Sequence, residues 1–373
     1  MKVSRVLHCF GGEASFAAEW LPTRLSDLGR SLSHELVGVT QEQWNAASRG
    51  SGGPRPKFLS EFPSLAGMPT PSRLLGLANA IKPFDLVLTY GYDALDVAMA
   101  HTLFSEALGL PPLIHHETVL SGEGRRRSWY RRIALGRAAG LVVPNERLEE
   151  AALVDWQQPI GRVKRFAPGV AVPSTRSVPK PDALPGVIKR DGEMWLGARI
   201  ESAADIAACS ALVDAVSQLS EDWHLVIISD GLDTDPLAAA AESQEIAHRL
   251  HFASPVADLG SVMGLFEGWA GLSDSPVARE DALIAMASAR PIIAVAKRDI
   301  AALLAPENAD CAADASSAKA FRDSLLAALV DDQTRAKLGE VNHAFAKKHY
   351  DLAQAIDRYR RLYASAMGVE IKA

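Results

Sequence analysis

Two short loops in the first third of the sequence carry residues that could bind a phosphate or a sugar. Gly11 and Gly12 stand between a predicted strand and a predicted helix. Glycines let the backbone approach a ligand closely, and the N–H groups at a helix N-terminus attract anions. His115 and His116 end another predicted strand, where an imidazole could hydrogen-bond a hydroxyl or a phosphate. Alternatively, the two glycines form only a tight turn, and the two histidines are buried rings whose nitrogens hydrogen-bond backbone groups.

Two later segments also follow predicted strands. Ser229-Asp230-Gly231 is an acidic turn of the kind in which many strands end. The block 272–294, LSDSPVAREDALIAMASARPIIA, predicts a loop, then a helix of small residues, then a strand. Such small residues favour close packing of the helix against a sheet. By themselves these two segments do not identify a ligand.

The segment 124–137, GRRRSWYRRIALGR, concentrates positive charge in a chain whose formal net charge is −6. It could rest on an anionic membrane surface, where aromatic side chains sit at the level of the headgroups. It could also bind a phosphate-bearing acceptor, or form an ordinary solvated helix face. The candidate contact residues are Arg125, Arg126, Arg127, Trp129, Arg131 and Arg132.

Composition excludes several classes of protein. The 373 residues are 48% hydrophobic and 23% charged, which is ordinary for a globular chain of about two domains. A net negative charge disfavours general nucleic-acid binding. The cysteines, Cys9, Cys209 and Cys311, lie too far apart in the sequence for a disulfide framework or a cysteine zinc site. No apolar segment is long enough to span a bilayer, so we expect a cytoplasmic protein that is soluble or peripheral at the inner membrane face.

Strand-like runs alternate with amphipathic helical patterns through most of the chain. This alternation predicts an α/β fold with mostly parallel sheets. The segment 172–186, VPSTRSVPKPDALPG, contains four prolines and predicts a domain boundary. A Gly-, Pro- and Ser-rich stretch at 41–71 predicts a surface loop. The predicted strands are 3–10, 35–40, 85–90, 112–117, 140–144 and 162–166, then 194–197, 224–229, 249–252, 269–273 and 291–296.

Seven segments in the right order resemble the GT-B-fold glycosyltransferases, specifically their large retaining family 4. These segments are VLHCFGGEASFAAEWL, LIHHETVL, RVKRFAPGVAV, MWLGARI, HLVIISDGLD, the stretch from RLHFASP to GLSDS, and LIAMASARPIIA. The resemblance covers almost the whole chain. It implies two Rossmann-like domains facing a central cleft, namely an acceptor-side domain at 1–172, a linker at 173–186 and a nucleotide-sugar domain at 187–345. A C-terminal helix at 346–373 would pack back toward the first domain.

The sequence departs from the family at functional positions. The family carries two glutamates separated by seven residues, but their places are occupied here by Pro276 and Ile284. It also places an arginine, and a lysine five residues later, on the donor diphosphate. Arg199 holds the first of these places and Ala204 the second. Arg199 is informative because a guanidinium pairs bidentately with phosphate oxygens.

The resemblance assigns roles to individual residues. The active-site histidine would be His116 or His115, in contact with the donor sugar. No metal and no cofactor is expected, because Arg199 and helix N-termini would hold the diphosphate of the co-substrate. The implied donor-binding residues are Gly11, Gly12, Arg199, Asp230, Gly231, Phe252, Asp274, Ser275 and Glu280.

The expected function is transfer of a sugar from a nucleotide-diphosphate sugar to a glycan or lipid-linked acceptor, with retention. The common setting of the family is assembly of cell-surface polysaccharide or glycolipid in the bacterial cell envelope. The expected partners are therefore a nucleotide sugar, such an acceptor and an anionic membrane, and no nucleic acid. Because the two glutamates and the lysine are missing, an inactive binding or scaffold subunit is the alternative. A sugar-nucleotide epimerase of similar fold is a third hypothesis.

Overall fold

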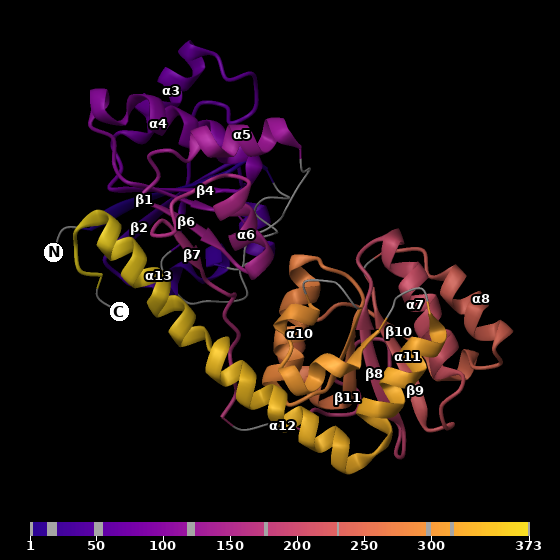
Figure 1. Cartoon of the computed structure of the whole chain (residues 1–373). Coiled ribbons are helices and arrows are strands. Elements are labelled where there is room, and N and C mark those ends of the chain that lie inside the picture. Colours follow the sequence, from indigo (N-terminus) through magenta and orange to yellow (C-terminus); the bar gives the residue numbers. More distant parts are fainter. Residues whose placement is uncertain are drawn as a thin grey trace. The chain divides into compact units, whose positions relative to one another are not determined.

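The computed structural model describes residues 3–12, 21–47, 55–117, 124–174, 178–229, 231–295, 300–313 and 317–371. The chain divides into two compact units (Figure 1). The first comprises Met1–Gly169 and Ala353–Ala373, and the second comprises Val170–Leu352. The predicted linker, 173–186, therefore lies within the second unit, and the last helix of the chain belongs to the first.

The first unit is built on a parallel sheet of seven strands among the described residues, in the order β3-β2-β1-β4-β5-β6-β7. Helices flank the sheet (Figure 1). The strands are β1 Ser4–Phe10, β2 Leu32–Val37, β3 Lys57–Phe58, β4 Leu86–Tyr90, β5 Leu113–His116, β6 Gly140–Val143 and β7 Val163–Arg165. The helices are η1 Leu21–Leu28, α2 Gln41–Ala47, α3 Pro71–Ile81, η2 Tyr92–Ala94, α4 Leu95–Leu108, α5 Arg125–Ala134, α6 Glu146–Val154 and α13 Leu352–Met367.

The last helix, α13, packs onto the first unit through its aromatic and basic residues. Tyr359 and Tyr363 are buried against the sheet. Arg360 donates from Nε to the carbonyl of Leu28 at 3.2 Å and from Nη2 to the carbonyl of Asp27 at 2.5 Å. These carbonyls end η1, so the helix closes one side of the unit that the first 169 residues build.

The second unit has a parallel sheet with six strands in its described part, in the order β10-β9-β8-β11-β12-β13. The strands are β8 Met194–Arg199, β9 Trp223–Ile228, β10 Leu250–Ala253, β11 Phe266–Gly271, β12 Ile292–Val295 and β13 Ala312–Ala313. The helices are α7 Ala203–Val216, α8 Asp235–Ser243, η3 Ala247–Arg249, α9 Leu259–Val262, η4 Met263–Leu265, α10 Pro276–Ala287, η5 Ala301–Leu303, η6 Pro306–Cys311, α11 Ala318–Leu325, the π-helix η7 Leu326–Val330 and α12 Asp332–His349.

The two parallel sheets confirm the predicted α/β fold. The central strands of each are buried along almost their whole length, as strands covered on both faces must be. None of the helices in the described part of the chain is long and apolar enough to cross a membrane.

The predicted surface loop at 41–71 was wrong in part, because it contains α2 and β3. Thr40 begins α2 with a reciprocal cap: its Oγ1 accepts from the Gln43 N–H, and Gln43 Oε1 accepts from the Thr40 N–H. This capping box is visible in the sequence as Thr-x-x-Gln and would have predicted the helix. β3 forms because Lys57 and Phe58 pair with Glu35 and Leu36 of β2, a contact that no local pattern indicates.

Candidate functional site

Arg199 ends β8 at the carboxyl edge of the second sheet, where the resemblance places a donor diphosphate. Its Nε donates to Oδ2 of Asp281 at 2.5 Å, and its Nη2 lies 3.5 Å from Oδ1. The side chain of Asp281 is 1% exposed and that of Arg199 13%. Burial raises the pKa of Asp281 to about 6, against the opposing effect of the guanidinium. At pH 7 the pair is ionised, so the positive charge of Arg199 is already compensated.

Further carboxylates surround this ion pair. Glu280 and Glu201 both raise the pKa of Asp281 by their negative charge. The Oγ of Ser275 donates to Oε2 of Glu201 and accepts from the Ala278 N–H at 2.9 Å, which caps α10. Arg199 therefore shares its surroundings with three acidic side chains. The net charge here is less favourable for binding a diphosphate than the arginine and lysine of the family that the sequence resembles.

The N-terminus of α7 is closed by its own residues. Oδ2 of Asp205 accepts from the N–H groups of Glu201 and Ser202, both at 3.0 Å. The side chain of Ser202 in turn completes a capping box with this aspartate. Some of the donors that could meet a phosphate at this edge are thus already engaged.

The other predicted donor residues lie in different surroundings. Oδ1 of Asp274 accepts from the Ile300 N–H at 3.4 Å. Gly231 has a φ of +65° and open space where a Cβ would stand. Phe252 packs against the hydrophobic core of the unit, and Asp230 falls outside the described residues. Ser275 bonds Glu201, and Glu280 and Glu201 act by charge on Asp281, the partner of Arg199. Phe252 instead packs against the core with its apolar ring.

His116, at the end of β5, is almost fully buried in the first unit. Its Nε2 lies 3.1 Å from the hydroxyl of Tyr363 on α13. Its ring packs against Tyr90, with 4.7 Å between the ring centroids, and against Tyr359 at 5.7 Å. Burial and the neighbouring His115 lower the pKa of His116 to about 3. The ring is neutral at pH 7, and a sugar could reach it only after the tyrosines moved.

His115 and the paired glycines have structural partners too. Nδ1 of His115 lies 2.9 Å from the hydroxyl of Thr89, and the ring is fully buried. A Cβ on Gly11 would stand 2.0 Å from Cβ of Asp93, so packing alone requires glycine there. A Cβ on Gly12 would meet no atom within 4 Å. Of these residues, Gly12 has the most open backbone.

The basic helix α5 is anchored by one of its arginines. Arg131 is buried, and its Nε and Nη2 both lie 3.0 Å from Oε2 of Glu117. Its guanidinium also stacks over the rings of Tyr92 and Trp156, at 4.8 and 4.7 Å. Arg131 therefore does not face a membrane or an acceptor, which differs from the prediction. The exposed members of the predicted set are Arg125, Arg126, Arg127, Trp129 and Arg132.

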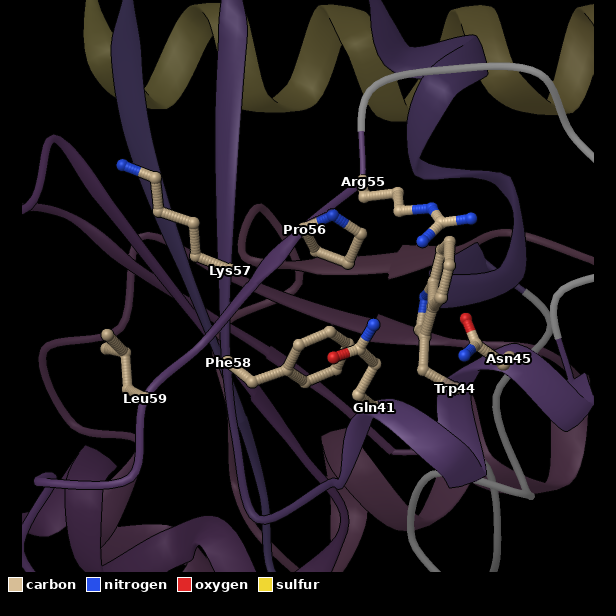
Figure 2. Close-up of a pocket in the computed structure, with 8 residues that line it drawn as sticks. All are labelled: Gln41, Trp44, Asn45, Arg55, Pro56, Lys57, Phe58 and Leu59. Carbon is tan, nitrogen blue, oxygen red and sulfur yellow. The ribbon is translucent and has the colours of Figure 1, made fainter.

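A pocket of about 470 Å³ opens on the first unit beside α2 and β3 (Figure 2). The ring of Trp44 meets that of Phe58 edge-on, with centroids 6.4 Å apart. The side chains of Arg55, Asn45 and Gln41 lie around these rings in Figure 2. Aromatic rings with neighbouring amides and cations suit a sugar that carries a negative charge. The sequence does not predict this pocket, because the Gly, Pro and Ser content of 41–71 favours a loop.

The fold is that of GT-B glycosyltransferases. Anabaena Alr3699/HepE, crystallised with UDP and glucose, matches 97% of this chain and 100% of its own, with TM-score 0.70 and 13% identity. The lipopolysaccharide outer core galactosyltransferase WaaB matches 97% and 99%, with TM-score 0.65 and 12% identity. A Listeria monocytogenes protein provisionally assigned as a UDP-N-acetylglucosamine 2-epimerase matches all of both chains, with TM-score 0.65 and 16% identity.

No protein-family model matches the sequence, and no curated protein matches it significantly. The structural neighbours therefore establish the fold alone. The chemistry of the site has to be inferred from the residues of this chain. Of the carboxylates around Arg199, Glu280 was predicted from the sequence, whereas Asp281 and Glu201 were missed. Asp281 was visible one helical turn before Ile284, but spacing alone did not indicate that it faces β8.

We predict that Arg199→Ala lowers the free energy of unfolding by about 3–5 kcal/mol, because it leaves the buried Asp281 carboxylate without its cation. Adding Asp281→Asn should recover most of this loss by removing the charge. Urea unfolding of the two variants measures both effects. Arg361→Ala, which removes an exposed arginine of α13, is the control and should change little. If the single and double variants are equally unstable, the ion pair is not the cause.

We also predict acid sensitivity from His116. Its pKa is about 3 in the folded chain and about 6.5 in the unfolded chain. The unfolded state therefore binds the proton more readily, and stability is lost as the pH falls from about 6.5 toward 3. At about pH 4.5 His116 alone should lower the free energy of unfolding by about 2–3 kcal/mol relative to its value at pH 7.

Urea unfolding at the two pH values, on the wild type and on His116→Phe, tests this prediction. The variant should lose less stability on acidification, by about the stated amount. Replacement of the exposed His248 by glutamine is the matched control and should follow the wild type. Equal pH dependence of wild type and His116→Phe would contradict the prediction.

Proposed function

We propose that this chain is a glycosyltransferase that moves a hexose from a nucleotide-diphosphate sugar to a glycan or lipid-linked acceptor. The observation that supports this most strongly is the full-length match to HepE, whose crystals contain UDP and glucose. The proposed setting is assembly of cell-envelope polysaccharide or glycolipid at the cytoplasmic face of the membrane. Likeness to the outer core galactosyltransferase WaaB is consistent with that setting.

In this proposal the donor diphosphate binds at the carboxyl edge of the second sheet. Nε and Nη2 of Arg199 face Asp281, which leaves Nη1 to donate to a phosphate oxygen. When the glycosidic bond of the donor breaks, negative charge grows on the departing diphosphate, and a fixed donor stabilises it. The acceptor hydroxyl forms the new bond to the sugar carbon, with retention, and its proton passes to an oxygen of the departing diphosphate. Neither a metal nor a cofactor takes part in this step.

The acceptor would bind on the first unit. The pocket beside Trp44 offers it an aromatic face and the cations Arg55 and Lys57. The exposed arginines of α5 would hold a phosphate-bearing lipid or the membrane that contains it. In this arrangement Arg131 fixes the helix to Glu117, while Arg125 to Arg127 and Trp129 face outward.

A second function, that of an inactive scaffold subunit, is favoured by the charge balance at Arg199. Three carboxylates neighbour this arginine, and the family's lysine is replaced by Ala204. His116, the other expected contact, is covered by Tyr363. A chain without sugar transfer would need neither an open histidine nor a net positive diphosphate site.

Nucleotide-sugar binding separates the two functions. A thermal-shift screen of UDP-, GDP- and ADP-sugars first identifies a donor, because a ligand of the folded state raises its melting temperature. Calorimetry then compares Asp281→Asn with Arg199→Ala/Asp281→Asn. Asp281 is neutral in both, so the pair isolates the arginine from the loss of its buried partner. We predict that Asp281→Asn binds more tightly than wild type.

The double variant should bind about 10- to 100-fold more weakly than Asp281→Asn, as expected for a charge-assisted hydrogen bond of about 1.5–3 kcal/mol. Equal affinities in the two variants would place the diphosphate away from Arg199. Absence of binding by any donor, in the wild type and in Asp281→Asn, would favour the scaffold function.

Vesicle binding tests the proposed role of α5. Binding to anionic vesicles should exceed binding to neutral ones and weaken with salt. Replacing Arg125, Arg126 and Arg127 by glutamine should weaken it on the order of 100-fold, because each basic residue near such a surface contributes about 1 kcal/mol. The control removes two exposed lysines of α12, Lys347 and Lys348. Partitioning that is insensitive to salt would indicate a solvated helix face.

A further inference from the structure

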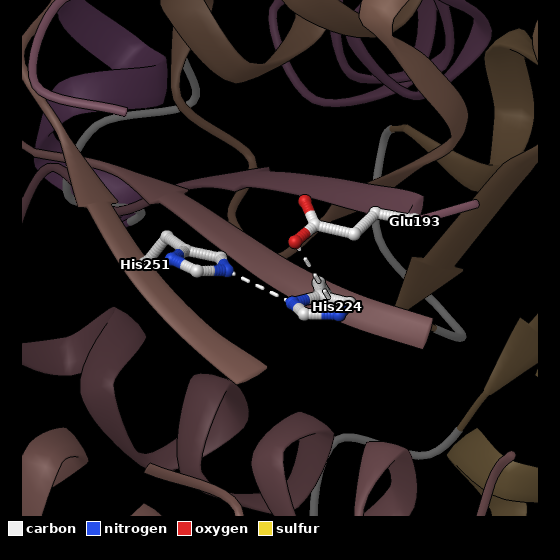
Figure 3. A group of neighbouring side chains, drawn as sticks. All are labelled: Glu193, His224 and His251. Carbon is white, nitrogen blue, oxygen red and sulfur yellow. Dashed lines mark hydrogen bonds and ion pairs between the residues drawn. The ribbon is translucent and has the colours of Figure 1, made fainter. Parts of the chain in front are cut away.

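Glu193, His224 and His251 lie together on the second unit, although they come from separate segments of the sequence (Figure 3). Glu193 immediately precedes β8, His224 is the second residue of β9 and His251 the second residue of β10. One ligand atom from each lies within 4.8 Å of the others. The group is at the amino-terminal side of these strands, whereas Arg199 ends β8 at the opposite edge.

The register of the sheet explains why the two imidazoles meet. Trp195 pairs with His224, and Val226 pairs with His251. Residues two apart in a strand share a face, so His224, Val226 and His251 project to the same side of the sheet. The rings stack almost in parallel, at an angle of 9°. Nδ1 of His224 lies 2.9 Å from Nε2 of His251.

The carboxylate of Glu193 is held in a fixed orientation. Its Oε2 accepts from the Arg190 N–H at 3.0 Å and from the Trp195 indole N–H at 2.9 Å. Its Oε1 lies 3.9 Å from Nε2 of His224. Hydrogen bonds of this kind orient the ligating carboxylates of metal centres. The side chains of Glu193 and His224 are each 11% exposed, so the group is sheltered without being sealed from solvent.

We propose that Glu193, His224 and His251 form a binding site for a divalent transition-metal ion such as Zn²⁺. Two imidazoles and one carboxylate are a common zinc ligand set, with water in the fourth position. Imidazole nitrogens on a tetrahedral zinc ion lie about 3.3 Å apart, given Zn–N bonds of about 2.0–2.1 Å. A small rotation of either ring would increase the distance between Nδ1 of His224 and Nε2 of His251 from 2.9 Å to about that value.

The protonation states suit this role. Burial lowers the pKa of both His224 and His251, so the rings are neutral and can offer lone pairs at pH 7. The bound ion would join the amino-terminal sides of β8, β9 and the edge strand β10, and so stabilise the second unit. It would take no part in the proposed transfer at Arg199.

Calorimetric titration of the full chain with ZnCl₂ tests the site, using metal-free protein without an oligohistidine tag. We expect one ion per chain and a rise in melting temperature on saturation. His251→Ala and Glu193→Gln should each weaken binding by about 100-fold or more, since loss of even an outer-shell partner costs 10- to 100-fold. His349→Gln, which removes an exposed histidine of α12, should bind as the wild type does.

Co²⁺ supplies a second readout that does not depend on the stability of a variant. The wild type should give the visible absorption of four-coordinate Co²⁺, and Zn²⁺ should displace it, whereas Mg²⁺ prefers oxygen ligands and should not. Circular dichroism without metal verifies that each variant is folded. Zinc binding that is not saturable at one ion per chain, or that persists unchanged in both site variants, would overturn the proposal.

Discussion

The ion pair between Arg199 and Asp281 is the interaction on which the candidate donor site depends. It joins the end of β8 to α10, and one of its members is almost completely buried. A charge in that position is stable only while its partner remains. The same guanidinium must therefore hold the fold together and, in the proposed function, also contact a diphosphate.

An arginine with both roles, pairing with a buried aspartate and contacting a diphosphate, distinguishes the chain from the family that it resembles. There, an arginine and a lysine meet the diphosphate, and glutamates hold the sugar and the ribose. Here the lysine is absent, and Asp281 approaches the arginine from the same helix on which the family carries a glutamate. In the proposed function, a donor would share Arg199 with this aspartate. Because Asp281 offsets the charge of this arginine, we expect the donor to bind more weakly than it would to an arginine without a carboxylate partner.

The sequence predicted the architecture well, because alternation of apolar strands and helices is a local property. It also placed His116 near the end of a strand, where the structure has it, but it ended the strand that carries Arg199 two residues too early. It did not predict what covers them. Tyr363 reaches His116 from 247 residues away, and the face of α10 that carries Asp281 is set by packing. The Glu193, His224 and His251 group was likewise invisible, because sheet register brings it together.

Hydrogen–deuterium exchange with and without the best-binding nucleotide sugar tests the central claim most directly. If the donor binds around Arg199, backbone protection should appear at 199–205, where β8 leads into α7, and at 272–280, where β11 leads into α10. The strands beneath should change little, since they are already buried. Protection confined to the pocket beside Trp44, or absent from both segments at saturating donor, would contradict the account.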